Sequence, residues 1–206
     1  MTPYYSDDHV TLYHARWEDV PPDLLRADVL VTDPPYGIAA AKAGAHSSIR
    51  DDARWPRMEW DNDRPSGPVR RLVEMFDASA IWGGNYFADV LPASSGWLAW
   101  IKPEAETGFS LADMELCWTS LPMAARVKRY ARRDGNQHPT QKPVDVMTWT
   151  IGFLPPGTIL DPYAGSGTTL VAAKSLGRKA IGVECVERYC EVAANRLRQE
   201  VLGLSA

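Results

Sequence analysis

The sequence is poor in the residues that build metal clusters and disulfide frameworks. Among its 206 residues are only three cysteines and four histidines. The cysteines, Cys117, Cys185 and Cys190, form no CxxC pair, and an odd count argues against a disulfide framework. The histidines are too scattered along the chain to indicate a metal cluster. We therefore predict neither disulfides nor a metal site.

Long apolar runs are also absent. The chain has no stretch of 18 apolar residues and no charged-then-apolar leader, so we expect neither a membrane span nor a signal peptide, and place the protein in the cytoplasm. It shows no internal repeat and no low-complexity tract. The composition, 45% hydrophobic and 23% charged, is ordinary for a soluble protein and predicts one domain over residues 1–206.

An excess of positive charge is missing as well. The net charge of −4 does not by itself indicate a nucleic-acid partner. Positive charge is nevertheless concentrated in one place, because five basic residues lie within eight positions: Arg126, Lys128, Arg129, Arg132 and Arg133. We interpret this basic run as a contact for phosphates, with a solvated charged face as the alternative.

The most informative stretch is the motif Asp33-Pro34-Pro35-Tyr36, which closes an apolar run at residues 29–32. Such a run predicts a buried parallel strand, and the carboxyl ends of these strands are where open α/β sheets place their chemistry. The prolines restrict the backbone, so the Pro34 carbonyl can face a ligand beside the Asp33 carboxylate. Two acceptors and an aromatic ring suit a planar base with an amino group. A solvated turn is the alternative reading of these prolines.

A second motif lies near the far end of the chain. Residues 158–161 predict a strand, residues 162–169 a glycine-rich turn, and Leu170–Leu176 a helix that stops at Gly177. The next predicted strand, residues 179–184, ends in an acid. This order is that of a nucleotide-binding βαβ unit, in which the glycines let a ligand approach the backbone and the terminal acid binds ribose hydroxyls.

The features that this second motif lacks narrow the choice of nucleotide ligand. There is no GK[ST], so it is not a phosphate-binding P-loop, and GxGxxG fails because Leu170 stands where the third glycine would be. The failure of GxGxxG disfavours a nicotinamide-dependent oxidoreductase. Asp161 would repel a pyrophosphate and favours a cationic ligand. S-adenosylmethionine, with its ammonium, sulfonium and ribose, fits these requirements, while a tight structural turn is the alternative for Gly165 and Gly167.

Apolar patterns elsewhere predict the remaining elements. We expect strands at residues 9–13, 80–82, 97–101 and 114–119, a short helix at residues 21–26, and helices at residues 69–77 and 144–154. Residues 40–70 lack such a pattern but contain tryptophans. We interpret this segment as a lid or a DNA-contacting loop, with a mobile surface excursion as the alternative.

With both motifs in view, the chain resembles the amino-methylating (DPPY) DNA methyltransferases, in the permuted, beta-type order with DPPY before the cofactor loop. It is most similar to the small DNA modification methylases of phages and prophages. The stretches that carry the resemblance are residues 33–37, 81–87, 96–98, 115–120, 138–143 and 160–184. The family implies a Rossmann-like α/β fold: a mostly parallel seven-stranded sheet with one antiparallel strand and helices on both faces. In it the first strand lies at one edge, and the glycine-loop unit meets the DPPY strand at the centre.

The resemblance also implies roles for individual residues. The catalytic set is Asp33, Pro34, Pro35 and Tyr36. The cofactor-binding set is Asp33, Thr140, Lys142, Asp161, Tyr163, Gly165, Gly167, Thr168 and Glu184. The basic run contacts DNA, and residues 121–137 form a very short target-recognition segment. One departure from the family is Ala15-Arg16, which stands where a Gly-Asp pair near the cofactor adenine is common.

These expectations define a reaction. The enzyme would transfer a methyl group from S-adenosylmethionine to N6 of a flipped-out adenine in duplex DNA, leaving S-adenosylhomocysteine, as in restriction-modification systems. The Asp at the head of DPPY leans toward adenine; cytosine-N4 methylation and a non-catalytic binding module of the same fold are the alternatives. Methylation at cytosine carbon is disfavoured because no cysteine follows a proline. Monomer and homodimer both stay open.

Overall fold

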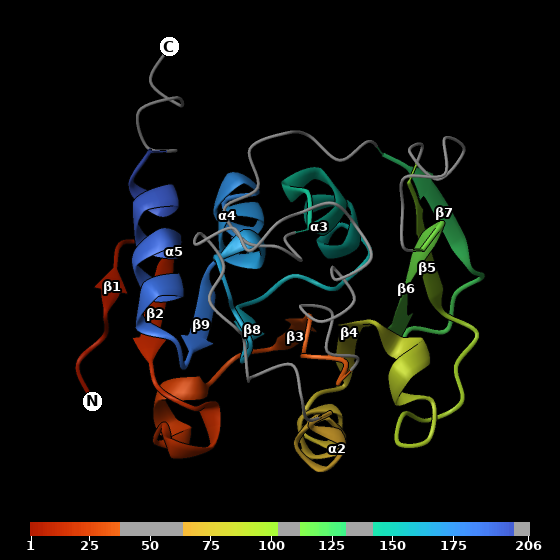
Figure 1. Ribbon diagram of the computed structural model, residues 1–206, viewed down its shortest axis with the longest axis horizontal. Helices are drawn as coiled ribbons and strands as arrows, with labels where there is room; N and C mark the ends of the chain where they lie inside the picture. The colour runs from red at the N-terminus through yellow and green to blue at the C-terminus, as the bar shows by residue number, and fades with distance from the viewer. Residues whose placement is uncertain (38–63, 103–111, 131–141, 200–206) are drawn as a thin grey trace, which may run out of the picture.

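The computed structural model describes residues 1–37, 64–102, 112–130 and 142–199, which build a nine-stranded mixed sheet with helices on both faces (Figure 1). The strands are β1 (Tyr5–Ser6), β2 (Val10–His14), β3 (Val29–Thr32), β4 (Ala78–Trp82), β5 (Trp97–Ile101), β6 (Met114–Thr119), β7 (Arg126–Arg129), β8 (Ile159–Asp161) and β9 (Ala180–Glu184). The α-helices are α2 (Ser66–Glu74), α3 (Val144–Ile151), α4 (Thr168–Ser175) and α5 (Glu187–Gln199). Short 3-10 helices are η1 (Trp17–Asp19), η2 (Pro22–Leu25) and η5 (Gly84–Phe87).

The strand order is β1-β2-β9-β8-β3-β4-β6-β5-β7. Strands β2, β9, β8, β3 and β4 run parallel, β6 is antiparallel to both β4 and β5, and β7 runs parallel to β5. The carboxyl ends of β3, β4, β5, β7, β8 and β9 therefore share one edge of the sheet. The amino end of the reversed strand β6 lies at this same edge, which we call the carboxyl edge.

The Rossmann-like fold inferred from the sequence is confirmed, and β8 of the glycine-loop unit pairs with β3 of the DPPY motif at the centre of the sheet. The seven strands expected from the sequence correspond to β2-β9-β8-β3-β4-β6-β5 in the sheet, and β6 is the expected antiparallel strand. The strand count needs correction, because the two-residue strand β1 adds antiparallel to β2 and the basic strand β7 adds beyond β5. Both are short edge strands with little apolar alternation, so the sequence carries no strong signal for them.

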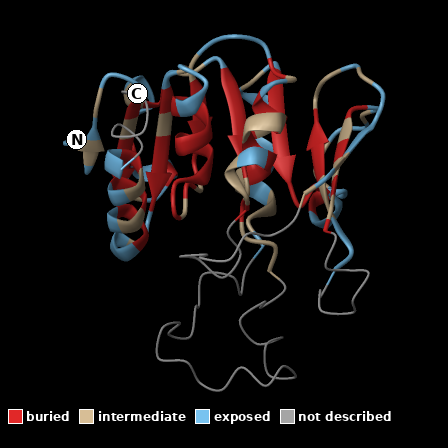
Figure 2. Ribbon diagram, turned by 90° about the horizontal axis from the view of Figure 1, so that it is seen from above, coloured by how far each residue is buried: buried red, intermediate tan, exposed pale blue. Residues whose placement is uncertain are grey.

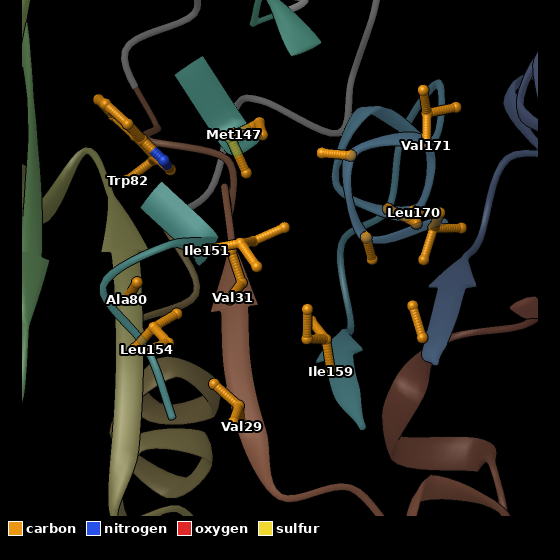
Figure 3. Close-up of a cluster of buried hydrophobic side chains, with 14 of the residues drawn as sticks. Val29, Val31, Ala80, Trp82, Met147, Ile151, Leu154, Ile159, Leu170 and Val171 are labelled. Atoms are coloured by element: carbon orange, nitrogen blue, oxygen red, sulfur yellow. The ribbon is translucent and has the colours of Figure 1, made fainter. Parts of the chain in front are cut away.

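Strand β3 is buried on both faces because all four of its residues are apolar or β-branched. Figure 3 shows the core on one face of the sheet, where side chains of the strands lie opposite those of α3 and α4: Val29, Val31, Ala80 and Ile159 from the sheet, Met147 and Ile151 from α3, and Leu170 and Val171 from α4. On the opposite face, Leu30 and Ile81 pack with residues of η1, η2, α2 and η5. Figure 2 shows that burial concentrates in the strands and in the helix faces turned toward them. The central strand is thereby held from both sides.

The helix boundaries differ from the sequence expectation by a few residues. Helix α2 begins at Ser66 rather than at residue 69, with Gly67 and Pro68 in its first turn, where proline is tolerated because the first N–H groups have no helical partner. The loop expected over residues 40–70 therefore ends earlier, and the rest of that prediction lies outside the described residues. Helix α3 stops at Ile151, and α5 was not anticipated from the sequence.

None of the helices in the described ranges combines the length and the hydrophobicity needed to cross a bilayer.

A buried ion pair joins the first β-hairpin to the helices. Lys174 of α4 is buried and donates to Asp7 Oδ2 at 2.5 Å and to the Leu197 carbonyl of α5 at 3.0 Å. Asp7 also accepts from the Tyr5 hydroxyl and from the backbone N–H groups of His9 and Val10. Although burial opposes it, these donors, led by Lys174, hold the pKa of Asp7 far below its usual range.

We predict that Asp7→Asn lowers the free energy of unfolding by about 1–3 kcal/mol at pH 7, because it leaves the Lys174 charge buried without its counterion while Asp7 itself is partly exposed. The pKa of Asp7 is depressed in the folded state, so its contribution is present above the unfolded pKa and is lost as pH falls through the folded one. Urea titrations of both proteins from pH 7 down to pH about 3 should show the difference shrinking below pH about 4. A difference that grows on acidification would contradict this assignment.

Candidate active site

Asp33 follows β3 at the carboxyl edge, and both of its carboxylate oxygens have partners. Oδ2 accepts from Lys142 Nζ at 2.5 Å, and Oδ1 accepts from the Tyr36 hydroxyl. The Asp33 side chain is 25% exposed, whereas Lys142 is 4% exposed. Pro34 is buried directly after it. The DPPY motif thus presents a partly accessible carboxylate on a rigid, closely packed turn.

The ring of Tyr36 is fixed by two neighbours from the segment after β4. It stacks on Tyr86, with ring centroids 4.7 Å apart and planes 16° from parallel. Gly83 adopts a φ of +69°, and a Cβ there would lie 2.0 Å from Cε1 of Tyr36. Glycine at position 83 is therefore required both by the backbone and by the approach of the ring. Tyr86 is itself exposed at 37%, so the aromatic pair opens to solvent.

Lys142, just before α3, joins Asp33 to a wider chain of charges. Its Nζ lies 3.0 Å from Glu115 Oε2, and Glu115 Oε1 lies 2.7 Å from Lys102 Nζ. Each ammonium also faces an indole: Lys142 lies 5.3 Å from the ring centroid of Trp82, and Lys102 lies 5.3 Å from that of Trp100. Two cations and two anions alternate along this cluster, which we call the four-charge chain.

The electrostatics follow from burial and from this alternation. Burial raises the pKa of Asp33; Lys142 opposes the rise and Glu115 adds to it. Burial also disfavours the charge on Lys142, but its two carboxylate neighbours outweigh that effect and raise its pKa. Glu115 is likewise buried, yet Lys142 and Lys102 bring its pKa down to about 2. The two carboxyl groups of the cluster are therefore shifted in opposite directions: the pKa of Glu115 is lowered and that of Asp33 is raised.

The glycine-rich turn lies beside this cluster, between β8 and α4. Gly165 has a φ of +52°, and a Cβ there would meet nothing within 4 Å, so open space lies above the loop. Its N–H donates to Glu184 Oε2 at 2.8 Å, and Val186 N–H donates to Glu184 Oε1 at 2.7 Å. Gly167, predicted to bind the cofactor, also allows close packing, because a Cβ there would come within 2.7 Å of Cβ of Ala193 in α5.

Asp161 closes β8 and is buried next to β3. Its Oδ1 accepts from the Thr32 hydroxyl at 2.7 Å and from the Tyr163 N–H at 3.1 Å. Burial raises the pKa of Asp161 to about 6, although these hydrogen bonds and one from Thr169 oppose the rise. A carboxylate held this way is an acceptor for a cation, with a charge that changes near neutral pH.

The back of the glycine-rich turn is braced by side chains from other elements. Arg196 of α5 donates to the Ser166 carbonyl at 2.7 Å and to the Thr168 hydroxyl at 3.1 Å. The Tyr163 hydroxyl accepts from Trp17 Nε1 at 3.2 Å. Thr168 and Tyr163, both predicted to bind the cofactor, thus also serve to hold the loop in place.

The predicted site residues fall into two groups on one edge. Asp33, Tyr36 and Lys142 form one group, and Asp161, Tyr163, Gly165 and Glu184 line the other. The pairing of β3 with β8 and the Thr32–Asp161 hydrogen bond bring the two groups side by side. Thr140, predicted with Lys142, lies outside the described residues.

The basic run is partly described. Arg126, Lys128 and Arg129 belong to β7, whose edge position leaves both arginines exposed. The Lys128 ammonium lies over the rings of Tyr130 and Trp149, at 5.9 and 5.8 Å. Strand β7 ends at the carboxyl edge, where β5 and Lys102 also end. Arg132 and Arg133 lie outside the described residues.

Sequence reasoning missed three residues that the structure places in the site: Lys102, Glu115 and Tyr86. A signal existed for Glu115, because a charged residue in the apolar alternation of residues 114–119 shares the face of buried Cys117. Tyr86 lies within residues 81–87, one of the stretches that carry the family resemblance, but no role was assigned to it; Lys102 directly follows the strand predicted at residues 97–101 and carried no comparable signal.

Within the described ranges, no group of three or more His, Cys, Asp or Glu side chains is arranged to hold a metal ion.

Comparison with known proteins agrees with this geometry. Residues 77–195 match the DNA methylase family N6_N4_Mtase. Over 102 residues the chain is 38% identical to the type II methyltransferase M2.DpnII of Streptococcus pneumoniae; the match covers 48% of this chain and 35% of that relative, so the chain spans about a third of its length.

Among solved structures, the M1.HpyAVI–SAM complex covers 91% of this chain and 99% of its own, with a TM-score of 0.57 and 24% identity. The PvuII DNA methyltransferase, described as cytosine-N4-specific, covers 94% of this chain and 88% of its own, with a TM-score of 0.57 and 14% identity. At these identities the likeness establishes the fold. The match over more than half of the chain establishes the family inferred from the sequence: this protein belongs to the amino-directed DNA methylases.

Proposed function

We propose that this protein transfers a methyl group from S-adenosylmethionine to the exocyclic amine of a flipped-out base in double-stranded DNA, namely N6 of adenine. The observation that carries the proposal is the junction of β3 and β8. There a rigid Asp-Pro-Pro-Tyr turn stands beside a glycine-rich loop bounded by two buried acids, Asp161 and Glu184.

The residues present fit this cofactor. The open space above Gly165 allows a ligand to approach the backbone, which a side chain at this position would prevent. Asp161 would hold the ammonium, and Glu184, at the end of β9, would accept from ribose hydroxyls. Lys142 was also predicted to meet the methionine carboxylate together with Thr140, but its ammonium already faces Asp33, Glu115 and the Tyr36 hydroxyl, so the geometry does not support that contact. The chemistry that the cofactor supplies when bound is a methyl group on a positively charged sulfur, which leaves as a neutral thioether.

The protein's own contribution is to orient the target amine. Asp33 would accept one N–H and the Pro34 carbonyl the other, so that the nitrogen lone pair points toward the methyl group. Holding the reactants in an attack geometry accounts for most of the expected acceleration. Asp33 is also the nearest acceptor for the proton that the amine gives up.

The aromatic pair would receive the flipped base. Tyr36 already stacks on Tyr86, so an aromatic surface of the required kind is present, and the base would replace Tyr86 or extend the stack. Strand β7, which exposes Arg126 and Arg129 and ends with Arg129 at the carboxyl edge, supports a contact with DNA phosphates.

The test is transfer of labelled methyl from S-adenosylmethionine to unmethylated duplex DNA, followed by digestion to nucleosides and mass analysis. We expect N6-methyladenine. N4-methylcytosine would correct the base while keeping the mechanism. No transfer to DNA of varied sequence, with cofactor binding intact, would overturn the proposed activity in favour of a non-catalytic module.

We predict that Asp33→Ala lowers the methyl-transfer rate at least about 100-fold while the affinity for the cofactor changes little, because the carboxylate positions the amine. Single-turnover transfer measures the first quantity, and calorimetric titration with S-adenosylhomocysteine measures the second. Transfer at the wild-type rate would refute the role of Asp33.

We predict that Gly165→Ala weakens cofactor binding at least about tenfold, because the new methyl group enters the space proposed for the ligand. Gly177→Ala is a matched control: its φ is +66°, and its Cβ would also meet nothing within 4 Å, but it follows α4 away from the site. Both variants should lose about 1–2 kcal/mol of stability through the left-handed backbone. Equal cofactor affinity in the two variants would contradict this placement of the ligand.

We predict that cofactor affinity falls as pH drops through about 6, the pKa to which burial raises Asp161. Above this pH the carboxylate is charged and attracts the ammonium; below it the neutral acid does not. Titration with S-adenosylhomocysteine between pH 5 and pH 8 measures the effect, and Asp161→Asn should bind weakly with a flat profile. A wild-type affinity that is constant through this range would exclude the ammonium contact.

A further inference from the structure

The four-charge chain extends beyond the residues to which the proposed reaction assigns a role. Glu115 lies between two lysines, with Oε1 2.7 Å from Lys102 and Oε2 3.0 Å from Lys142. Lys142 in turn lies between two carboxylates, 2.5 Å from Asp33 and 3.0 Å from Glu115. All four side chains are a quarter exposed or less. Charges buried this far are retained only when they are paired, so each holds its neighbours in place.

The arrangement bears directly on Asp33. If Asp33 were the only carboxylate partner of Lys142, the buried ammonium would bind Asp33 with its full attraction. Asp33 would then have to give up this strong contact before it could accept a hydrogen bond from the target amine. Glu115 shares this attraction, and Lys102 keeps Glu115 ionised. Because β6 runs antiparallel to β4 and β5, Glu115, the second residue of β6, lies at the carboxyl edge.

We propose that Glu115 is a positioning residue for methyl transfer: by dividing the charge of Lys142 with Asp33, it leaves the Asp33 carboxylate free to bind the target amine. This inference rests on the proposed function. Glu115 does not touch the substrate and acts through Lys142, while Lys102 supports it from the other side.

The sign of the effect follows from the charged and titratable groups that face Asp33. These are Lys142, Glu115, Tyr36, Cys117 and Asp161. Among them the Glu115 charge opposes ionisation of Asp33, and the Lys142 charge favours it. Removing the Glu115 charge therefore lowers the pKa of Asp33 and tightens its pair with Lys142. The acidic limb of the activity profile then moves to lower pH, while turnover on the plateau falls.

The test measures kcat/KM for DNA and kcat at saturating S-adenosylmethionine across pH 5 to pH 9. Because S-adenosylmethionine is saturating, the pH dependence of cofactor affinity predicted for Asp161 does not affect the measured rates. For Glu115→Gln, which preserves the shape and hydrogen-bonding capacity of the side chain, we expect the acidic limb to move down by about half a pH unit or more and kcat on the plateau to fall about fivefold or more. An unmoved limb, or one that moves up, would overturn the proposal.

Asp7→Asn is the matched control, because it also removes the charge of an acid paired at 2.5 Å with a buried lysine, but at the opposite end of the sheet. It should lower thermal stability and leave the limb in place. If Glu115 had only a structural role, Glu115→Gln would likewise lower thermal stability and leave the acidic limb in place.

If Glu115→Gln does not fold, Lys102→Met probes the chain from its other end. Glu115 is then left with Lys142 alone, the cluster loses a positive charge, and the limb should move to higher pH; an unmoved limb would again overturn the proposal. Failure of the proposed function is distinguishable, since the wild-type protein would then transfer no methyl group to DNA.

Discussion

The structure around the site depends on the burial of one carboxylate beside one ammonium. Asp33 follows a strand that is apolar on both faces, so its charge stands at the border of the core and needs a counterion. Lys142 supplies it from the turn that begins α3, a segment more than 100 positions away in the chain. Lys142 in turn needs Glu115, and Glu115 needs Lys102. The requirement to neutralise each buried charge thereby ties together β3, β5, β6 and the start of α3.

The sheet topology converts two separate motifs into one site. The DPPY turn and the glycine-rich turn lie far apart in sequence, yet β3 and β8 are hydrogen-bonded neighbours that run in the same direction. Their carboxyl ends consequently meet at one edge, where Thr32 donates to Asp161 across the boundary. Helices on each face occupy the sides of the sheet, so a ligand reaches these residues from the edge.

The glycines show how similar residues in one motif take different tasks. Gly165 borders open space, so its lack of a side chain leaves the backbone of the loop accessible. Gly167, two positions later, faces Ala193 and serves the close packing of α5 against the loop. Gly83 has no part in either; it makes room for the ring of Tyr36. A sequence pattern specifies where small residues are required, but the neighbour that requires them comes from another element.

The βαβ order, the central strands and the two turns that carry the candidate site could be predicted from the sequence, because these depend on local signals: apolar runs, proline pairs and glycines at turns. Helix α5 was within reach of the same reasoning, since Tyr189, Cys190, Ala193 and Leu197 recur at helical spacing. The pairing of Glu115 with Lys102 and Lys142 becomes visible only in the folded protein. The charge of Glu115 within an apolar alternation is visible in the sequence, but only the reversal of β6 between β4 and β5 brings it to the carboxyl edge. Strand direction is set by long-range hydrogen bonding and by the burial of charge, and neither is encoded in any short stretch of the chain.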